Sequence, residues 1–274
     1  MPPFLMMAAR SLIAGTVLFA WARLREGERP APGQWRAAVA VGTLLFLGCH
    51  GLLAWAEQSV PSGVAALMLA TIPVWMTLLD WASGGARPRW RAVVGLALGL
   101  LGLVFLIGPG PRDGAPLVGL MALVASAFAW AAGSILSRHL PRPPSLVLAS
   151  GMQLLAGGTA LAVVGLAIGE AGRVDAGVLA PRPVLAFVYM VVAASLVSFT
   201  AYMWLLRVST PARVGTYAFV NPVVALFVGW AIGGERLDAR TLAASLVIVV
   251  GVALVVTAAA NGARRARAAR GALA

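Results

Sequence analysis

Long hydrophobic stretches without any aspartate, glutamate or arginine follow one another along the whole chain. Each contains about 20 residues or more, which is enough for a helix to cross the hydrocarbon core of a bilayer. Unpaired backbone amides and carbonyls are too costly in lipid for strands or loops, so helices are expected. The uninterrupted stretches are 37–56, 58–79, 92–111, 114–137, 143–169, 183–206, 214–234 and 241–263. One more, about 3–22, contains Arg10. Together they predict an all-α polytopic membrane protein with nine transmembrane helices.

Two proline-containing dipeptides followed by a tryptophan occur twice, about 150 residues apart, which indicates a duplicated unit. The first copy is Val60-Pro61, Ile72-Pro73 and Trp81, and the second is Thr210-Pro211, Asn221-Pro222 and Trp230. The helix expected at about 116–138 would have its counterpart before Met1. We therefore expect two repeats, 1–109 with four helices and 114–260 with five, then a basic tail at 261–274. The first of ten helices would be missing.

An odd number of helices in each unit would give the two repeats opposite orientations in the membrane. Inverted repeats of this kind are typical of secondary transporters, whose substrate site lies near the bilayer midplane. The duplication therefore favours transport over a membrane-embedded enzyme. It also leaves open an inactive or assembly-dependent truncation product, because a whole helix would be lost.

Composition supports a membrane location, since 61% of the 274 residues are hydrophobic and 11% are charged, which is outside the range of soluble domains. The net charge of +12 comes from arginine alone. A nucleic-acid-binding protein would gather such charge in one patch, whereas these arginines lie in short loops between spans. No nucleic-acid partner is expected.

Alternate loops are rich in arginine, and basic short loops stay on the cytoplasmic side. The arginine-rich segments hold Arg23, Arg25, Arg29, Arg36, Arg87, Arg89, Arg91, Arg138, Arg142, Arg207, Arg213, Arg264, Arg265, Arg267 and Arg270. This count predicts a cytoplasmic C-terminus and an N-terminus outside. The alternative for the first stretch is a signal peptide, with Ala20-Trp21-Ala22 as cleavage site. Arg23 and Arg25 directly afterwards argue against export of that segment.

The residue inventory excludes several chemistries. Cys49 is the lone cysteine, so neither an intrachain disulfide nor a thiolate metal site is expected. The absence of lysine removes a phosphate-binding loop of the Walker type. Two histidines with few carboxylates in the spans supply no clustered acid–base or metal set. The sequence therefore predicts neither enzyme activity, nor a metal, nor a cofactor.

Three runs, in order along the chain, resemble the EamA-type drug/metabolite transporter family. They are AWAEQ at 54–58 with VPSG at 60–63, SAFAWAAGS at 126–134, and YAFVNPVVA at 217–225 followed by Gly234-Glu235. The similarity covers essentially the whole chain. It implies two inverted five-helix repeats with both ends cytoplasmic. It also implies a bacterial inner-membrane carrier that exports or exchanges small metabolites, including amino-acid-like or amphipathic solutes. Cys49-His50-Gly51 departs from the asparagine that often precedes this glycine in the family.

Depth in the membrane selects candidate residues for the substrate pathway. Asn221 and Pro222 lie at the centre of one span, and Thr71 and Pro73 lie near the centre of another. Proline removes a backbone donor and frees a carbonyl one turn earlier, and such groups are tolerated in lipid where a cavity or a polar partner satisfies them. The two prolines are thus expected to bend helices around a cavity, or alternatively to improve packing. Asn221 would bind substrate or join two helices by hydrogen bonds.

Further candidates combine a polar atom with a flat or small side chain. His50 can bind solute or titrate, or it can join two helices. Aromatic rings with one polar handle commonly line cavities for amphipathic solutes. The candidates of this kind are Trp75, Trp130, Tyr202 and Tyr217, and Ser198 adds a hydroxyl group.

Charged side chains inside spans are costly and point to function by default. Arg10 and Glu57 are expected at similar depth near the outer face, where they would form either a candidate gate or a structural pair. No carboxylate occupies the centre of a span, so no proton relay is evident. Glycines at 95, 99 and 102 form a small-residue face, which fits packing within the chain or a homodimer.

These observations lead to one hypothesis. The chain would be a secondary transporter that works by alternating access, with a small-molecule substrate held between the Pro73 and Pro222 helices. Aromatic rings would select the shape of the solute, while Asn221, Thr71 and His50 would supply polar contacts. The identity of the solute, the direction of transport and its energy source lie beyond the sequence.

Overall fold

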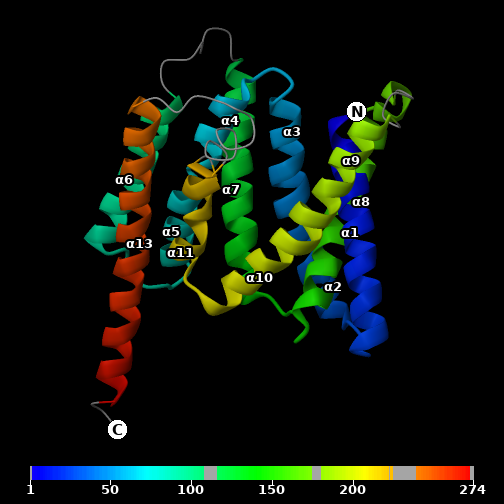
Figure 1. Cartoon of the computed structure of the whole chain (residues 1–274). Helices are drawn as coiled ribbons and strands as arrows, with labels where there is room; N and C mark the ends of the chain where they lie inside the picture. The colour runs from blue at the N-terminus through cyan, green and yellow to red at the C-terminus, as the bar shows by residue number, and fades with distance from the viewer. Residues whose placement is uncertain (1, 108–115, 175–179, 222, 225–238, 272–274) are drawn as a thin grey trace. The chain divides into compact units, whose positions relative to one another are not determined.

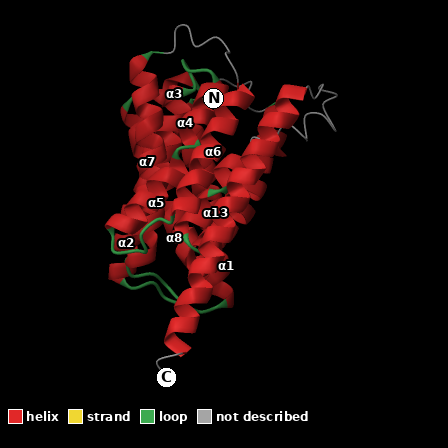
Figure 2. Ribbon diagram, turned by 90° about the vertical axis from the view of Figure 1, so that its left-hand side faces the viewer, coloured by secondary structure: helices red, strands yellow, loops and turns green. Residues whose placement is uncertain are grey.

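The computed structural model describes residues 2–107, 116–174, 180–221, 223–224 and 239–271 (Figure 1). Every regular element in these ranges is a helix (Figure 2). Six helical stretches are long and apolar enough to cross a membrane, and two shorter apolar helices cover 90–105 and 242–258. The six are Pro3–Arg25, Pro32–Ala56, Val64–Ala82, Leu117–His139, Leu146–Ala167 and Pro181–Val208. The polytopic all-α fold is confirmed. The count of nine spans stays a prediction, because the span at 214–234 lies largely outside the described residues.

The helices divide into two compact units. Unit 1 comprises Met1–Ser59 and Leu117–Val208, and unit 2 comprises Val60–Pro116 and Ser209–Ala274. The helices of unit 1 are α1 (Pro3–Arg25), α2 (Pro32–Gly42), η1 (Thr43–Gly51), α3 (Leu52–Ala56), α7 (Leu117–His139), α8 (Leu146–Ala167), η2 (Glu170–Arg173), α9 (Pro181–Tyr189), η4 (Met190–Ser198) and α10 (Phe199–Val208). Those of unit 2 are α4 (Ser62–Leu69), α5 (Ile72–Ala82), α6 (Trp90–Ile107), α11 (Pro211–Gly215) and α13 (Ala239–Gly271). Each unit thus takes one segment from each predicted repeat.

Elements of the first half recur in the second. Pro32 opens α2 and Pro181 opens α9, in first-turn positions where the amide that proline lacks is not needed. Each of these helices continues into a π-helical segment, η1 in the first half and η4 in the second. Equivalent helices also pack on one another, α1 on α8 in unit 1 and α6 on α13 in unit 2 (Figure 1).

Glycines bring the backbones of these helix pairs into contact in unit 1. A methyl group added at Gly151 of α8 would lie 2.7 Å from the backbone nitrogen of Phe19 in α1. One added at Gly15 of α1 would lie 2.8 Å from the backbone nitrogen of Leu155. Small residues permit this approach, which dispersion forces then stabilise in lipid. The α1–α8 pair is the framework that carries the charged residue Arg10.

The small-residue face of α6 packs inside unit 2. A methyl group at Gly95 would lie 2.6 Å from the carbonyl oxygen of Gly251 in α13, and one at Gly102 would lie 2.7 Å from the Ile248 side chain. The glycine at 99 faces the Phe219 ring in the same way. Packing within the chain therefore accounts for this glycine face. A homodimer stays a prediction, and this face no longer supports it.

A buried carboxylate completes the N-terminal end of α1. Glu170 is 2% exposed, and its two oxygens accept hydrogen bonds from the backbone nitrogens of Phe4 at 3.3 Å and Leu5 at 2.8 Å. Gly169, whose φ of 75° favours glycine, ends α8 and turns the chain toward this position. The first amides of a helix have no partner within the helix, so Glu170 supplies one from another segment.

Candidate functional site

Four helical segments of unit 1 bring polar and aromatic side chains together inside the membrane-spanning part of the bundle. Arg10 comes from α1, His50 from η1, Trp130 and Ser134 from α7, and Tyr202 from α10. We call these five residues the Arg10 cluster. Four of them are candidates that the sequence selected: Arg10 as part of a possible gate, and His50, Trp130 and Tyr202 for the substrate pathway. The structure brings these four together.

The cluster begins with a hydrogen bond between two basic side chains. The Nη2 atom of Arg10 lies 3.1 Å from Nδ1 of His50. A guanidinium can only donate hydrogen bonds, so Nδ1 of His50 accepts and the ring proton of the neutral imidazole is on Nε2. Arg10 is 8% exposed, and its Nε atom is buried without a hydrogen-bond partner among the described residues.

Two contacts between tilted rings extend the cluster from His50 toward α10. The ring centroids of His50 and Trp130 are 5.3 Å apart, and those of Trp130 and Tyr202 are 5.1 Å apart. Ser134 donates to the carbonyl oxygen of Trp130 at 2.6 Å, so its oxygen is left to accept from the Tyr202 hydroxyl, also at 2.6 Å. A hydroxyl has one proton to donate, and this order satisfies both groups.

The π-helical geometry of η1 explains how His50 reaches this position. A π-helix inserts an extra residue into the turn, and such segments occur often at functional sites. The Cys49 carbonyl oxygen in η1 accepts a hydrogen bond of 3.0 Å from the Ser126 hydroxyl of α7. Ser126, Trp130 and Ser134 are spaced four residues apart, so they share one face of α7. All three belong to the run SAFAWAAGS at 126–134 that carried the family resemblance, yet sequence reasoning did not select the two serines for the site.

Arg10 and Glu57 do not form the pair expected from their similar depth. Within the described part of unit 1, Arg10 binds His50 instead. Glu57 lies just after α3 and is exposed. The part of its carboxyl that is covered loses water, which raises the pKa of this group. The wider π turn and the inward side of α1 together bring His50 within reach of the guanidinium, which the linear sequence could not indicate.

Ser198 does not join the cluster. Its side chain is exposed at the end of η4, and its hydroxyl donates to the carbonyl oxygen of Ala193 at 2.7 Å. The neighbouring Ser195 is 2% exposed, and its hydroxyl has no hydrogen-bond partner in the described ranges. Ser195 is therefore the buried hydroxyl of this segment.

Two helices of unit 2 are interrupted, and a threonine lies at each interruption. A turn at 70–71 separates α4 from α5, and there the Thr71 hydroxyl donates to the Met68 carbonyl oxygen at 2.6 Å. After α11, the Thr216 hydroxyl donates to the Arg213 carbonyl oxygen at 2.7 Å. Each side chain thus satisfies a carbonyl at the break, as broken membrane helices require.

These breaks show where Pro73 and Thr71 lie. Pro73 is the second residue of α5, just after the interruption, and it has no amide with which to continue α4. A bend at this proline stays a prediction. Pro73 is buried, and a methyl group on Gly215 would lie 3.0 Å from its Cα atom, so α5 and α11 touch closely here. Asn221 is exposed, and Pro222 lies outside the described residues.

The remaining aromatic candidates of unit 2, Trp75 and Tyr217, are both partly buried. Trp75 belongs to α5, and Tyr217 lies directly after the break at Thr216. Both rings therefore lie within one or two helical turns of the break in their helix.

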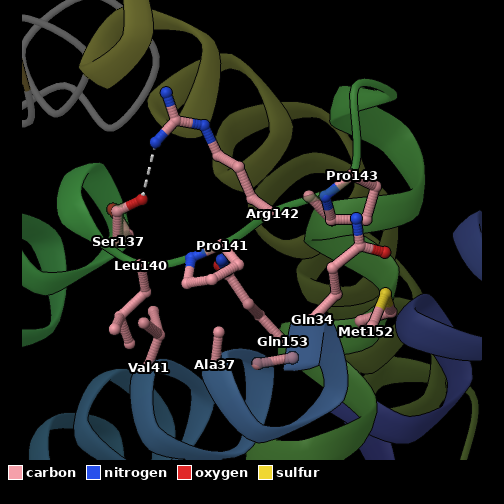
Figure 3. A pocket seen from close by; sticks show the side chains of 12 residues that line it. Gln34, Ala37, Val41, Ser137, Leu140, Pro141, Arg142, Pro143, Met152 and Gln153 are labelled. Carbon is pink, nitrogen blue, oxygen red and sulfur yellow. Dashed lines mark hydrogen bonds between the residues drawn. The ribbon is translucent and has the colours of Figure 1, made fainter. Parts of the chain in front are cut away.

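A small pocket in unit 1 lies between α2, the α7–α8 loop and α8 (Figure 3). Its open volume is about 10 Å³, which is room for about one water molecule. Arg142 closes one side and donates to the Ser137 carbonyl oxygen at 3.0 Å. The Oε1 atom of Gln153 is buried without a hydrogen-bond partner among the described residues. This pocket fits a water and is too small for a metabolite.

A larger groove of about 430 Å³ runs over α2, η1 and α8 in unit 1, and its lining is mostly apolar. The lining residues are Trp35, Val39, Thr43, Leu155, Ala156, Thr159 and Ala160. In the described ranges, no group of three or more histidine, cysteine or acidic residues is arranged to hold a metal ion.

Comparison with known proteins gives one consistent result. A model described as the EamA-like transporter family matches residues 1–108 and 117–257. The chain is 35% identical over 259 residues to the uncharacterized inner membrane transporter YedA of Escherichia coli (strain K12), covering 93% of this chain and 81% of that protein. It is 25% identical to a probable amino-acid metabolite efflux pump of Salmonella typhimurium, covering 92% and 85% of the two chains. A solved crystal structure with 24% identity matches with a TM-score of 0.76, covering 94% of this chain and 89% of that one, and shows the same fold.

Proposed function

The chain belongs to the EamA-like transporter family, and we propose that it is a secondary carrier that exports or exchanges small metabolites by alternating access. The solutes we propose are amino-acid-like or amphipathic, and the location is the bacterial inner membrane with the C-terminus in the cytoplasm. The names of two relatives support this choice. One is called a probable amino-acid metabolite efflux pump, which supports the solute class, and the other an inner membrane transporter, which supports the location. As a family member, the chain is a multi-pass membrane transporter and not an enzyme.

The observation that carries this proposal is the construction of the two units. Each unit combines a segment from the first half of the chain with its counterpart from the second half. Carriers with duplicated halves expose a substrate site alternately through the movement of bundles that keep their internal packing. The glycine contacts of α1 with α8 and of α6 with α13 give each unit that internal packing.

Specific residues follow from the site. We propose that Asn221 supplies a polar contact to the solute beside the interrupted helices of unit 2. The rings of Trp75 and Tyr217 in the same unit would select apolar shape. Thr71 would contribute by donating a hydrogen bond to the Met68 carbonyl oxygen at the break in its helix, because its hydroxyl already makes that bond.

Counterflow in proteoliposomes tests the proposal. Vesicles holding the purified protein and loaded with pooled amino acids and related metabolites should accumulate the labelled form of a transported solute, whereas protein-free vesicles should not. Asn221→Ala should lower the initial rate about tenfold, equivalent to about 1.4 kcal/mol of lost interaction. Glu26→Gln, at an exposed position, is the matched control. Failure of every pool to exchange would refute the carrier, and an unaltered rate for Asn221→Ala would refute the role of that residue.

A further inference from the structure

Among the described residues of unit 1, the charge of Arg10 has no acidic partner. Of the carboxylates described in unit 1, that of Glu170 accepts from the amides of Phe4 and Leu5. Glu57 is exposed after α3, and Glu28 accepts from the Ser145 amide. A cation inside a membrane bundle is costly and normally pairs with an anion or with several carbonyls. Arg10 has His50 as its hydrogen-bond partner, and His50 is neutral in this arrangement.

The guanidinium also keeps donors in reserve. His50 occupies one Nη2 position, while Nε is buried and has no partner among the described residues. Nε and an Nη atom form the fork that binds the two oxygens of a carboxylate in parallel. The next residue, Ser11, is fully buried in α1, and its hydroxyl likewise lacks a hydrogen-bond partner in the described ranges.

The aromatic row begins at the histidine that binds Arg10. The Trp130 ring lies against His50, and the Tyr202 ring lies against Trp130. A cation beside a run of flat apolar rings is complementary to a molecule that carries an anionic group on an apolar body. The hydrogen bond from Arg10 to His50 fixes the direction in which the guanidinium points, because the histidine accepts at Nδ1.

We propose that Arg10 is the anchor for the carboxylate of the transported solute, and that His50 orients its guanidinium. The solute class is thus an apolar or aromatic monocarboxylate, including amino acids. This inference rests on the proposed transport function. Arg10 is covered in the conformation described, so the carboxylate would reach it in another state of the transport cycle.

Thermal labelling of Cys49 tests the anchor without any knowledge of the natural substrate. Cys49 is the lone cysteine, is 3% exposed, and precedes His50, so a thiol-reactive dye reports when unit 1 opens. The protein is placed in nanodiscs of phosphatidylcholine alone. The probes are acetate, propanoate and 3-phenylpropanoate, each compared with its uncharged amide. The carboxylates should raise the labelling midpoint, most strongly for 3-phenylpropanoate, by about 3 °C or more near saturation, and the amides should not.

Variants assign the effect to the residue. Arg10→Gln should remove the difference between carboxylate and amide, and Arg10→Lys should weaken carboxylate binding about tenfold, since lysine keeps the charge without the fork. Arg23→Gln, on the same helix but bonded to the Glu28 carbonyl oxygen, should keep the full shift. Equal shifts for acid and amide in the unaltered protein, or none for any carboxylate, would overturn the proposal even if Arg10→Gln did not fold.

Two further outcomes separate this anchor from other possibilities. If phosphatidylglycerol in the nanodisc produced the Arg10-dependent shift and the carboxylates did not, a lipid headgroup would fill the site and the solute anchor would be wrong. If counterflow of a carboxylate solute proceeded at the same rate in Arg10→Gln as in the unaltered protein, the carrier function would stand while the anchor would fall.

Discussion

Two buried charges in unit 1 differ in how completely they are satisfied. Both oxygens of Glu170 accept backbone amides at the start of α1, so this carboxylate has a full structural explanation. Arg10 has a single hydrogen bond to a neutral ring and an unpartnered Nε atom among the described residues. Since an unsatisfied buried polar group costs free energy in the folded state, we assign Glu170 to stability and Arg10 to function.

Glu170→Gln is therefore expected to destabilise unit 1 without affecting solute binding. The amide side chain keeps one acceptor oxygen and loses the negative charge at the helix N-terminus, which should cost about 1–2 kcal/mol. The midpoint of thermal Cys49 labelling should fall by about 2–6 °C. Glu26→Gln, at an exposed carboxylate, serves as the control. A midpoint equal to that of the control would show that the contact with α1 contributes nothing.

The sequence predicted some members of the site and missed others for an identifiable reason. His50, Trp130 and Tyr202 stood out because each places a polar atom on a large ring within an apolar span. Serine and threonine hydroxyls gave no such guide, because on a helix they can bond to their own backbone. Ser198 and Thr71 do so, while Ser134 also joins Tyr202. Spans that are apolar on every side carry no amphipathic signal to separate these cases.

At the level of elements, apolar length predicted where helices occur but not how they are built. The stretch 37–56 contains the π-helical segment η1, and 58–79 is interrupted at Thr71. A hydrophobic run fixes only that backbone groups must be paired within the segment. It does not reveal whether the pairing is α-helical, π-helical or completed by a side chain. The proline at 73 marked the interruption, and the bend expected there stays a prediction.

Close contact between equivalent helices makes a second prediction. Gly95→Ala should destabilise unit 2 by about 1–3 kcal/mol, because the added methyl group meets the Gly251 carbonyl oxygen and forces α6 from α13. The fraction of protein that remains monodisperse after heating, measured by size-exclusion chromatography, should fall. Gly33→Ala has nothing within 4 Å of the new methyl group and should behave like the unaltered protein. Unchanged heat resistance of Gly95→Ala would contradict the packing described.

For the whole molecule, duplication was evident in the sequence while its spatial consequence was not. The repeated prolines identify which segments correspond, but correspondence does not state which copies pack together. The structure shows α1 with α8 and α6 with α13, so the compact units cut across the repeats at 1–109 and 114–260. Apolar faces of similar composition do not specify partners. The glycine face at 95, 99 and 102 was visible in the sequence, but the helix that packs on it is known only once the helices are placed.

Orientation in the membrane yields the third prediction. In a Cys49→Ala background, a cysteine at Ala86, in the exposed and arginine-rich loop between α5 and α6, should face the cytoplasm. A cysteine at Gly172, exposed in η2, should face the outside. A membrane-impermeant maleimide should label Gly172→Cys in intact cells and label Ala86→Cys only after permeabilisation. The reverse pattern would invert the topology derived from the arginines.

The interleaved construction of unit 1 affects how the protein can be assembled during synthesis. Residues 1–59 leave the ribosome well before α7, α8 and η4, against which they pack. Until those helices arrive, α1 must sit in the bilayer without the helix α8 that covers it and without the Trp130 and Tyr202 rings beside His50. Neither half of the gene alone encodes a closed bundle. The early helices of the nascent chain therefore remain in the bilayer without their final partners until α7 and α8 are inserted. A delay in the insertion of α8 leaves Arg10 facing lipid.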